Sequence, residues 1–338
     1  MEIEINQEDN KKSNKDYYFD SYDHIAIHEE MLQDQVRTGS YYKAIVKNKH
    51  LFKDKVVMDV GCGTGILSLF AASAGAKLVI GIDNSDIIFQ AEKIIKANNF
   101  SHIIKLIKNK IEDIQELPDK IEKVDIIVSE WMGYCLFFEN MLESVIFARD
   151  KWLAKDGLMF PDKFGFFLAG IENPNFKPDK IDFWKDVYGF DMTCFQDLVY
   201  LEPSVEAVDP ETIVTNTILL KEIDTQVLKK EDISLKSSFI LTTQKNCNLN
   251  GLVAFFTTTF SKCHKKVHFS TGPLTQQTHW RQSVFYLEEE INLKRGKTFR
   301  GVFSLFPNAK NSRDLDISIE YKTEPQKIFS KVQNYRFR

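Results

Sequence analysis

Two glutamates in the segment SEWMGYCLFFE, Glu130 and Glu139, are separated by bulky apolar residues with few charges nearby. Carboxylates on a loop whose intervening residues must be buried are held in place rather than freely solvated. A guanidinium is a planar, always protonated fork of N–H donors, so a pair of carboxylates is its natural clamp. The pair indicates a guanidinium site. The alternative is that Glu139 only begins a helix and Glu130 is an unrelated acid at a strand end.

A glycine-rich loop in VVMDVGCGTG places Gly61, Gly63 and Gly65 between an expected strand and an expected helix. Such a backbone turns tightly and approaches a ligand closely. The NAD fingerprint GxGxxG is not met, because Gly65 comes one residue early and Ile66 holds the position of the third glycine. GxGxG is instead the usual loop of S-adenosylmethionine-dependent methyltransferases, although an accidental turn can also produce it.

Three further residues have side chains suited to cofactor binding or to proton transfer. Asp83 ends the run KLVIGID, where a carboxylate can accept hydrogen bonds from both ribose hydroxyls of a nucleoside, or can simply begin the next helix. Glu112 follows a third strand-like segment, HIIKLIKNK, and could accept an adenine amino group, with a solvated surface charge as the alternative. His279 can accept a proton near neutral pH, and its alternative is a structural histidine in a strand-rich region.

Alternating strands and helices from Lys55 onward predict a doubly wound parallel sheet, which contains the glycine loop, Asp83 and Glu130. Apolar strands separated by amphipathic helices are typical of that fold. Strands are expected at 55–61, 77–83 and 124–130, and helices at 66–75, 85–99 and 140–153. Short helices are expected before residue 50, where aromatic and apolar residues recur at mixed helical spacing.

After Phe160 and Pro161 the sequence changes to β-branched and aromatic runs, which predict an antiparallel barrel or sandwich. An excursion at about 171–203 interrupts them with prolines and a helix-like FWKDVYGF rich in large apolar groups, which need a surface to cover. The expected organisation is a disordered tail at 1–16, N-terminal helices at 17–50, a cofactor domain at 51–160 and a β domain at 161–338.

Composition excludes several classes of protein. Lys and Arg number 44 against 48 Asp and Glu, a net charge of −4, so binding of nucleic acid through a basic surface is not expected and a basic partner is better matched. The five cysteines have no CxxC spacing, which argues against structural zinc and predicts reduced thiols in the cytoplasm or nucleus. Neither a signal peptide nor a membrane span is expected.

The strings SEWMGYCLFFE, DVGCGTGIL, DYYFDSY, HEEML, VRTGSYY, THW and PNAKNSRDLD resemble those of the type I protein arginine methyltransferases, over roughly residues 16 to 338. The resemblance implies a Rossmann-like S-adenosylmethionine-binding domain followed by a β-barrel with a helical dimerisation arm. It implies methyl transfer to a terminal guanidino nitrogen of protein arginine, giving S-adenosylhomocysteine and first monomethylarginine, then asymmetric dimethylarginine. The implied substrates are Gly/Arg-rich segments, as in RNA-binding proteins and histone tails, and the implied assembly is a homodimer, with higher oligomers left open. No metal is implied.

The resemblance also implies roles for individual residues. Glu130 and Glu139 match the family's double-Glu hairpin, His279 its THW loop and Asp34 the acid that pairs with that histidine, so these four are the implied catalytic residues. Arg37 matches the residue that binds the cofactor carboxylate, and Met31 helps to select the nitrogen that takes the second methyl. The implied cofactor-binding set is Phe19, His28, Met31, Arg37, Asp59, Gly61, Gly63, Asp83 and Glu112. The implied substrate-binding set is Tyr22, Met132, Tyr134 and Trp280.

Two residues depart from the family's pattern. Asp83 stands where Glu is common, and its shorter side chain is expected to weaken cofactor affinity or shift the strand end. Cys62 stands where Ser is common. Two other functions are less well supported. A methyltransferase for small molecules would not require the glutamate pair. A catalytically silent binding protein for Arg-rich partners would not require the intact catalytic groups.

Overall fold

The computed structural model describes residues 22–322 and 331–338, and the chain divides into two compact units. The first unit comprises Met1–Glu130 and Phe147–Leu158, and the second comprises Trp131–Ile146 and Met159–Arg338. The segment Trp131–Ile146, predicted to lie within the cofactor domain, belongs with the β-rich unit. The predicted tail at 1–16 lies outside the described residues.

The first unit is built on a five-stranded sheet in the order β3-β2-β1-β4-β5. The strands are β1 Val56–Val60, β2 Leu78–Asp83, β3 Ile104–Lys108, β4 Val124–Ser129 and β5 Leu153–Phe160. β1 pairs in parallel with both β2 and β4, and β2 with β3, which confirms the predicted doubly wound sheet. The strand order reverses between β1 and β4, and ligands of such sheets bind outside the carboxyl ends of the strands at that point. β5 was not predicted.

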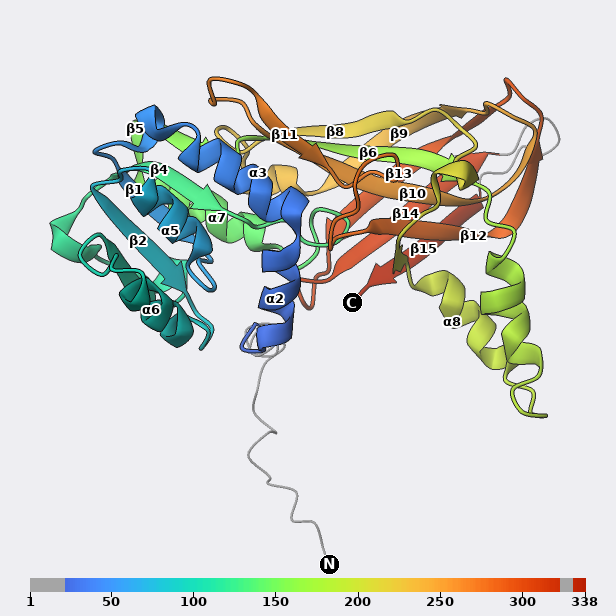
Figure 1. The fold of residues 1–338 in the computed structure, drawn as a ribbon. Helices are drawn as coiled ribbons and strands as arrows, with labels where there is room; N and C mark the ends of the chain where they lie inside the picture. The colour runs from blue at the N-terminus through green and yellow to red at the C-terminus, as the bar shows by residue number, and fades with distance from the viewer. Residues whose placement is uncertain (1–21, 323–330) are drawn as a thin grey trace, which may run out of the picture. The chain divides into compact units, whose positions relative to one another are not determined.

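Helices accompany this sheet (Figure 1). They are α2 Ile25–Gln33, α3 Gln35–Val46, α4 Lys49–Phe52, α5 Ile66–Ser73, α6 Ile88–Ala97 and α7 Met141–Trp152, with 3-10 turns η2 Ile111–Asp113 and η3 Pro118–Lys120. α5 packs on β1, β2 and β3, and α6 packs on β3. The short helices expected before residue 50 are α2, α3 and α4.

The second unit consists of two antiparallel sheets, in agreement with the predicted barrel-like domain. Its strands are β6 Lys163–Ile171, β7 Ser204–Glu206, β8 Ile218–Asp224, β9 Leu235–Thr242, β10 Cys247–Phe260, β11 Val267–Ser270, β12 Gln282–Leu293, β13 Thr298–Pro307, β14 Leu315–Lys322 and β15 Lys331–Phe337. One sheet runs β7-β12-β10-β6-β8 with β11 beside β10, and the other runs β15-β14-β13-β9. Phe166, Phe285 and Phe303 are fully buried in this unit, and the ring of Phe303 contacts the other two.

A helical excursion lies between β6 and β7, and we call residues 172–203 the arm (Figure 1). It contains the π-helix η4 Lys177–Ile181, the 3-10 helices η5 Asp182–Lys185 and η6 Thr193–Phe195, and α8 Gln196–Leu201. The predicted helix at 183–190 is wrong in its bounds: helical structure ends at Lys185, because Val187 and Phe190 close a tight bridge. Within this turn Tyr188 and Gly189 have positive φ of 54° and 89°.

Among the residues described, no helix combines the length and apolar character needed to cross a membrane.

Candidate active site

The glycine loop leaves β1 in a left-handed conformation, with φ of 71° at Gly61, 50° at Gly63 and 81° at Gly65. The amides of Gly61 and Cys62 donate to the carbonyl oxygen of Ile82, at 2.9 and 3.0 Å, which fixes the loop against the end of β2. L-residues rarely adopt such φ values, so the sequence requires glycine there. The loop then enters α5, whose first turn presents free amide groups of the kind that bind ligands.

Asp83, at the end of β2, joins the glycine loop to the turn that follows the strand. Its Oδ2 accepts a hydrogen bond from the amide of Gly63 at 2.8 Å. Its Oδ1 accepts from the amide and hydroxyl of Ser85, at 2.8 and 2.6 Å. A carboxylate has about four lone-pair positions, and three are used here, so about one remains for a ribose hydroxyl.

Asp59 is fully buried at the end of β1. Its Oδ2 accepts from the hydroxyl of Ser68 at 2.7 Å, whereas its Oδ1 has no hydrogen-bond partner among the described residues. Burial raises the pKa of this carboxyl to about 7, although the Ser68 hydrogen bond opposes the shift. An unsatisfied buried oxygen beside a glycine loop fits a site that is completed by a polar ligand, such as the nucleoside part of the cofactor.

The N-terminal helix α2 lies against the glycine loop through His28, which is 3% exposed. A Cβ added to Gly63 would lie 3.4 Å from Cε1 and 3.5 Å from Nδ1 of His28, which is ordinary contact, so the φ of 50° rather than the space favours glycine at position 63. The Nε2–H of His28 donates to the carbonyl oxygen of Tyr22 at 2.7 Å, which leaves Nδ1 as an acceptor in the neutral ring. The predicted cofactor residues His28 and Gly63 are therefore neighbours.

Asp34 begins α3. Its Oδ1 accepts from the amides of Val36 and Arg37 at 3.0 and 2.9 Å, which is an N-cap that satisfies two helix donors. The cap fixes the start of the helix that carries Arg37. Asp34 and His279 belong to different units, so their pairing stays a prediction.

Arg37 connects α2, α3 and β4. Its Nε donates to Oε2 of Glu130 at 2.8 Å, and the exposed fractions of the two side chains are only 8% and 7%. Its Nη1 donates to the carbonyl oxygen of Met31 at 3.1 Å and contacts the hydroxyl of Thr38 at 3.2 Å. Nη2 makes no hydrogen bond to a described residue, and this donor could meet a cofactor carboxylate.

The main chain beside Glu130 is also fixed. The buried hydroxyl of Tyr41 donates to the carbonyl oxygen of Ser129 at 2.9 Å, and the Ser129 hydroxyl donates to the carbonyl oxygen of Val60 at 2.8 Å. Burial, and after it the charge of Glu130, raise the pKa of Tyr41 far above its ordinary value, so its hydroxyl stays protonated as a donor. These bonds hold the carboxyl ends of β1 and β4 together.

The segment 131–140, which we call the glutamate hairpin, is unusually strained. Cys135, Leu136, Glu139 and Asn140 all have positive φ, of 52°, 65°, 71° and 51°. Such conformations of non-glycine residues cost free energy and gather at functional sites. A Cβ at Gly133 would lie 2.1 Å from the carbonyl oxygen of Phe138, so only glycine fits there.

Contacts within the β-rich unit hold the hairpin in this form. The indole N–H of Trp280 donates to the carbonyl oxygen of Met132 at 2.7 Å, and Trp280 is 3% exposed. The ring of Tyr134 stacks near Phe138 and Phe337, with centroids 6.5 and 6.4 Å away. Trp280 therefore holds the main chain of Met132 in place. Substrate contact by Met132, Tyr134 and Trp280 stays a prediction.

His279 and Glu139 occupy separate loops of this unit. The His279 ring lies 3.9 Å from the Trp280 ring between centroids, so the buried indole fixes its neighbour. The main chain of Glu139 exchanges two hydrogen bonds with Arg313: the Glu139 amide donates to the Arg313 carbonyl oxygen at 2.8 Å, and Arg313 Nη1 donates to the Glu139 carbonyl oxygen at 2.7 Å.

Several residues of this site were not recognised from the sequence. Ser68, Ser85 and Arg313 each orient a predicted residue, but a serine in a helix or an arginine in a polar loop gives no signal by itself. Of the predicted residues, Glu112 is exposed in η2 just after β3, and Phe19 lies outside the described residues. Within the described ranges, no group of three His, Cys, Asp or Glu side chains could hold a metal ion.

Comparison with protein families gives two matches. A model described as the arginine methyltransferase oligomerization subdomain matches residues 162–326. A model described as ribosomal protein L11 methyltransferase matches residues 39–145. The two matches fall on the β-rich part and on the part with the glycine loop.

Individual relatives cover nearly the whole chain. Protein arginine N-methyltransferase 1 of Caenorhabditis elegans is 52% identical over 309 residues, which are 91% of this chain and 89% of the relative. Protein arginine N-methyltransferase 8-B of Danio rerio is 52% identical over 308 residues, 91% of this chain and 73% of the relative.

Solved structures are similar over the same extent. The Trypanosoma brucei PRMT1 enzyme-prozyme heterotetrameric complex with AdoHcy matches with a TM-score of 0.89 and 43% identity, over 94% of this chain and 100% of that chain. Protein arginine methyltransferase 10 of Arabidopsis thaliana matches with a TM-score of 0.83 and 30% identity, over 95% of this chain and 100% of that chain.

Proposed function

The chain belongs to the protein arginine methyltransferase family of S-adenosylmethionine-dependent enzymes, and we propose that it is a type I member that makes monomethylarginine and then asymmetric dimethylarginine. The observation that carries the proposal is the buried Glu130 at the carboxyl end of β4, held by Arg37 and followed directly by the glutamate hairpin. A small amine or hydroxyl substrate would not require a second carboxylate in that hairpin.

The proposed division of labour follows from the chemistry of the side chains. S-adenosylmethionine supplies a methyl group on a sulfonium sulfur, which a guanidino nitrogen takes with loss of a proton, leaving S-adenosylhomocysteine. Glu130 and Glu139 hold the guanidinium by charge-assisted hydrogen bonds, so that its positive charge stays on the nitrogens they contact. The remaining terminal nitrogen is then the better nucleophile, and orientation with electrostatic stabilisation provides most of the rate.

The cofactor would be held in the first unit. Gly61 and Gly63 let the backbone approach it, Asp59 and Asp83 offer carboxylate oxygens, and Glu112 receives the adenine amino group. Arg37 offers its Nη2 donor to the cofactor carboxylate. His28 and Met31 are the described residues proposed to close over it. In the second unit His279 is the proposed acceptor of the released proton, and Asp34 of the first unit is its proposed partner. The proposed substrate-binding residues are Met132, Tyr134 and Trp280 of the second unit and Tyr22 of the first.

The proposed substrates are flexible, basic Gly/Arg-rich segments of RNA-binding proteins and histone tails. The net charge of −4 supports a cationic partner, because opposite net charges favour encounter. The five cysteines form no disulfide, which supports the proposed location in the cytoplasm and nucleus.

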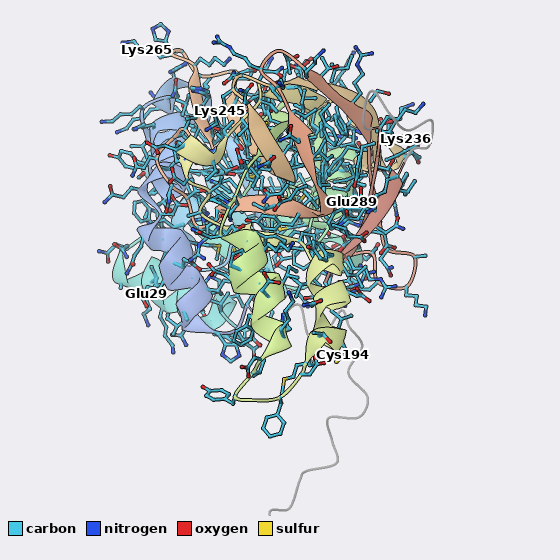
Figure 2. The ribbon with its side chains drawn as sticks, turned by 90° about the vertical axis from the view of Figure 1, so that its right-hand side faces the viewer. Glu29, Cys194, Lys236, Lys245, Lys265 and Glu289 are labelled. Carbon is cyan, nitrogen blue, oxygen red and sulfur yellow. The ribbon has the colours of Figure 1, made fainter. Side chains whose placement is uncertain are left out.

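The proposed assembly is a homodimer formed through the arm. Side chains of the arm are exposed although they are large and apolar: Tyr188 by 98%, Phe190 by 68% and Phe183 by 51%. The arm is firmly rooted, since Phe176 stacks on Tyr286 with ring centroids 3.6 Å apart. Figure 2 labels Cys194 on this arm and Glu289 on β12 of the same unit. A rooted arm with an uncovered apolar end fits a symmetric contact between two copies.

The proposal is tested by incubating the purified chain with S-adenosylmethionine and a Gly/Arg-rich peptide, then locating the methyl groups by fragmentation mass spectrometry. Two methyls on one terminal nitrogen are expected. Symmetric or single methylation would keep the family and overturn the type I assignment. Cofactor binding without transfer to a panel of such peptides would favour a silent binding protein.

A further inference from the structure

The last turn of the glutamate hairpin has a backbone that cannot be stable by local preference alone. Glu139 and Asn140 follow one another with φ of 71° and 51°. Left-handed backbone is unfavourable for non-glycine residues and persists only where their surroundings enforce it. Interactions with residues outside the hairpin are therefore needed to keep Glu139 in this conformation.

Arg313 provides such interactions, because it forms hydrogen bonds with both the amide and the carbonyl group of Glu139. The Glu139 amide donates to the Arg313 carbonyl oxygen at 2.8 Å, and Arg313 Nη1 donates to the Glu139 carbonyl oxygen at 2.7 Å. The second bond has a charged donor, which makes it stronger than a neutral one. Together the two bonds fix the peptide groups on each side of the Glu139 Cα, and these determine the direction of its side chain.

The loop that presents Arg313 is itself rigid. Asn308 Oδ1 accepts from the amides of Lys310 and Asn311 at 2.9 and 3.0 Å, and the Asn308 amide donates to the Asp314 carbonyl oxygen at 2.9 Å. Asn311 Nδ2 donates to Asp314 Oδ1 at 2.9 Å, and the Arg313 amide donates to Asn311 Oδ1 at 3.3 Å. Since these hydrogen bonds join residues within the loop between β13 and β14, the main chain of Arg313 is held in a fixed position.

We propose that Arg313 is a positioning residue, which holds Glu139 in the left-handed conformation that its carboxylate needs to receive a substrate guanidinium. The inference rests on the proposed function and adds to it a residue that acts on Glu139 through main-chain hydrogen bonds. Arg313 acts through Glu139, so its loss changes turnover and leaves the cofactor site of the other unit intact.

The test compares Arg313→Ala with Arg313→Lys and with the exposed Arg300→Ala, which removes an arginine from β13 of the same sheet. For Arg313→Ala we expect kcat to fall about 10²-fold, as for a misplaced catalytic group, with an unchanged Kd for S-adenosylmethionine by calorimetry. Arg313→Lys keeps one charged donor and should recover part of the loss. Arg300→Ala should match the unaltered chain.

A double-mutant cycle with Glu139→Gln separates positioning from a general structural effect. If Arg313 acts through Glu139, adding Arg313→Ala to Glu139→Gln should lower kcat by less than about threefold, because the group being positioned is already impaired. An equal loss in both backgrounds, or an undiminished kcat for Arg313→Ala, would overturn the inference. If Arg313→Ala does not fold, Asn311→Ala, which removes an anchor of the loop, takes its place in the cycle. Absence of methylation by the unaltered chain would instead remove the proposed function, and this inference with it.

Discussion

The guanidinium of Arg37 and the carboxylate of Glu130 form a nearly buried ion pair, with Nε 2.8 Å from Oε2. The same guanidinium donates to the carbonyl oxygen of Met31 at the end of α2, so one side chain links an N-terminal helix to the end of β4. A protein that binds substrate guanidinium groups thus uses one of its own to orient the carboxylate expected to receive them. The position of the Glu130 carboxylate and the position of the end of α2 therefore depend on the same guanidinium.

Arg37→Ala should lower stability, cofactor affinity and turnover together. Removing one partner of a buried pair leaves an uncompensated charge, which typically costs about 3–5 kcal/mol. Urea unfolding measures the stability change and calorimetry the cofactor affinity. Lys105→Ala, which breaks the exposed pair with Asp119, is the control and should cost less than about 1 kcal/mol. Equal effects of the two substitutions would show that the pair with Glu130 has no special role.

Glu139→Gln should separate binding from chemistry. The variant keeps the size of the side chain and the main-chain hydrogen bonds of residue 139 but loses one charge. The rate of methyl transfer should therefore fall by at least about 10²-fold to 10³-fold, while cofactor binding is retained. Steady-state kinetics with a Gly/Arg-rich peptide and calorimetry provide the two readings. Glu289→Gln, on β12, should leave both readings unchanged. Unaltered turnover of Glu139→Gln would refute the clamp.

Asp59 should make stability depend on pH. Its folded-state pKa of about 7 exceeds the ordinary value of 3.8, so between about pH 4 and about pH 7 the folded protein keeps a proton that the unfolded chain has released. Stability must therefore fall as pH rises through this window, by at most about 1.4 kcal/mol per pH unit from this group. Urea unfolding across the window should show a steeper fall for the unaltered chain than for Asp59→Asn, and parallel curves would contradict the assignment.

Asp83→Ala should weaken cofactor binding by more than the loss of one ribose contact would. The substitution also frees the amide of Gly63 and both donors of Ser85, so the glycine loop loses one of its hydrogen bonds to the end of β2. We expect the Kd for S-adenosylmethionine to rise by at least about tenfold to a hundredfold, as for removal of a charged hydrogen-bonding group. Ser85→Ala, which removes a single hydroxyl, should have a much smaller effect. Similar Kd values for the two variants would rule out the role of Asp83 in the loop.

The sequence predicted the architecture because the relevant signals are local. Strand and helix periods, and the three glycines after β1, each depend on a few consecutive residues, and their positions agree with the structure. β5 was missed because Lys155 and Asp156 interrupt its apolar pattern. The helix predicted at 183–190 failed because Val187 and Phe190 close a turn, which depends on pairing rather than on helical propensity.

The supports of the site could not be predicted in the same way. The bond from Trp280 to Met132 and the bonds between Arg313 and Glu139 join residues more than a hundred positions apart. Both involve main-chain carbonyl oxygens, which every residue has, so no residue type marks the acceptor. Sequence motifs identified the groups with chemistry, whereas the contacts that orient them became visible only in three dimensions.

The arm provides the last prediction, because the rings of Tyr188 and Phe190 are mostly uncovered by the rest of the chain. Replacing Tyr188 and Phe190 together by Ser should leave the fold intact, since both side chains are mostly exposed, and should convert the proposed dimer into a monomer in sedimentation velocity. A stable interface normally buries about 1,600 Å² in total, and large aromatic side chains contribute most of its binding free energy. Leu274→Ser, at an apolar side chain that is 75% exposed outside the arm, is the matched control and should remain dimeric. A double variant that sediments like the unaltered chain would show that the arm does not hold the dimer together.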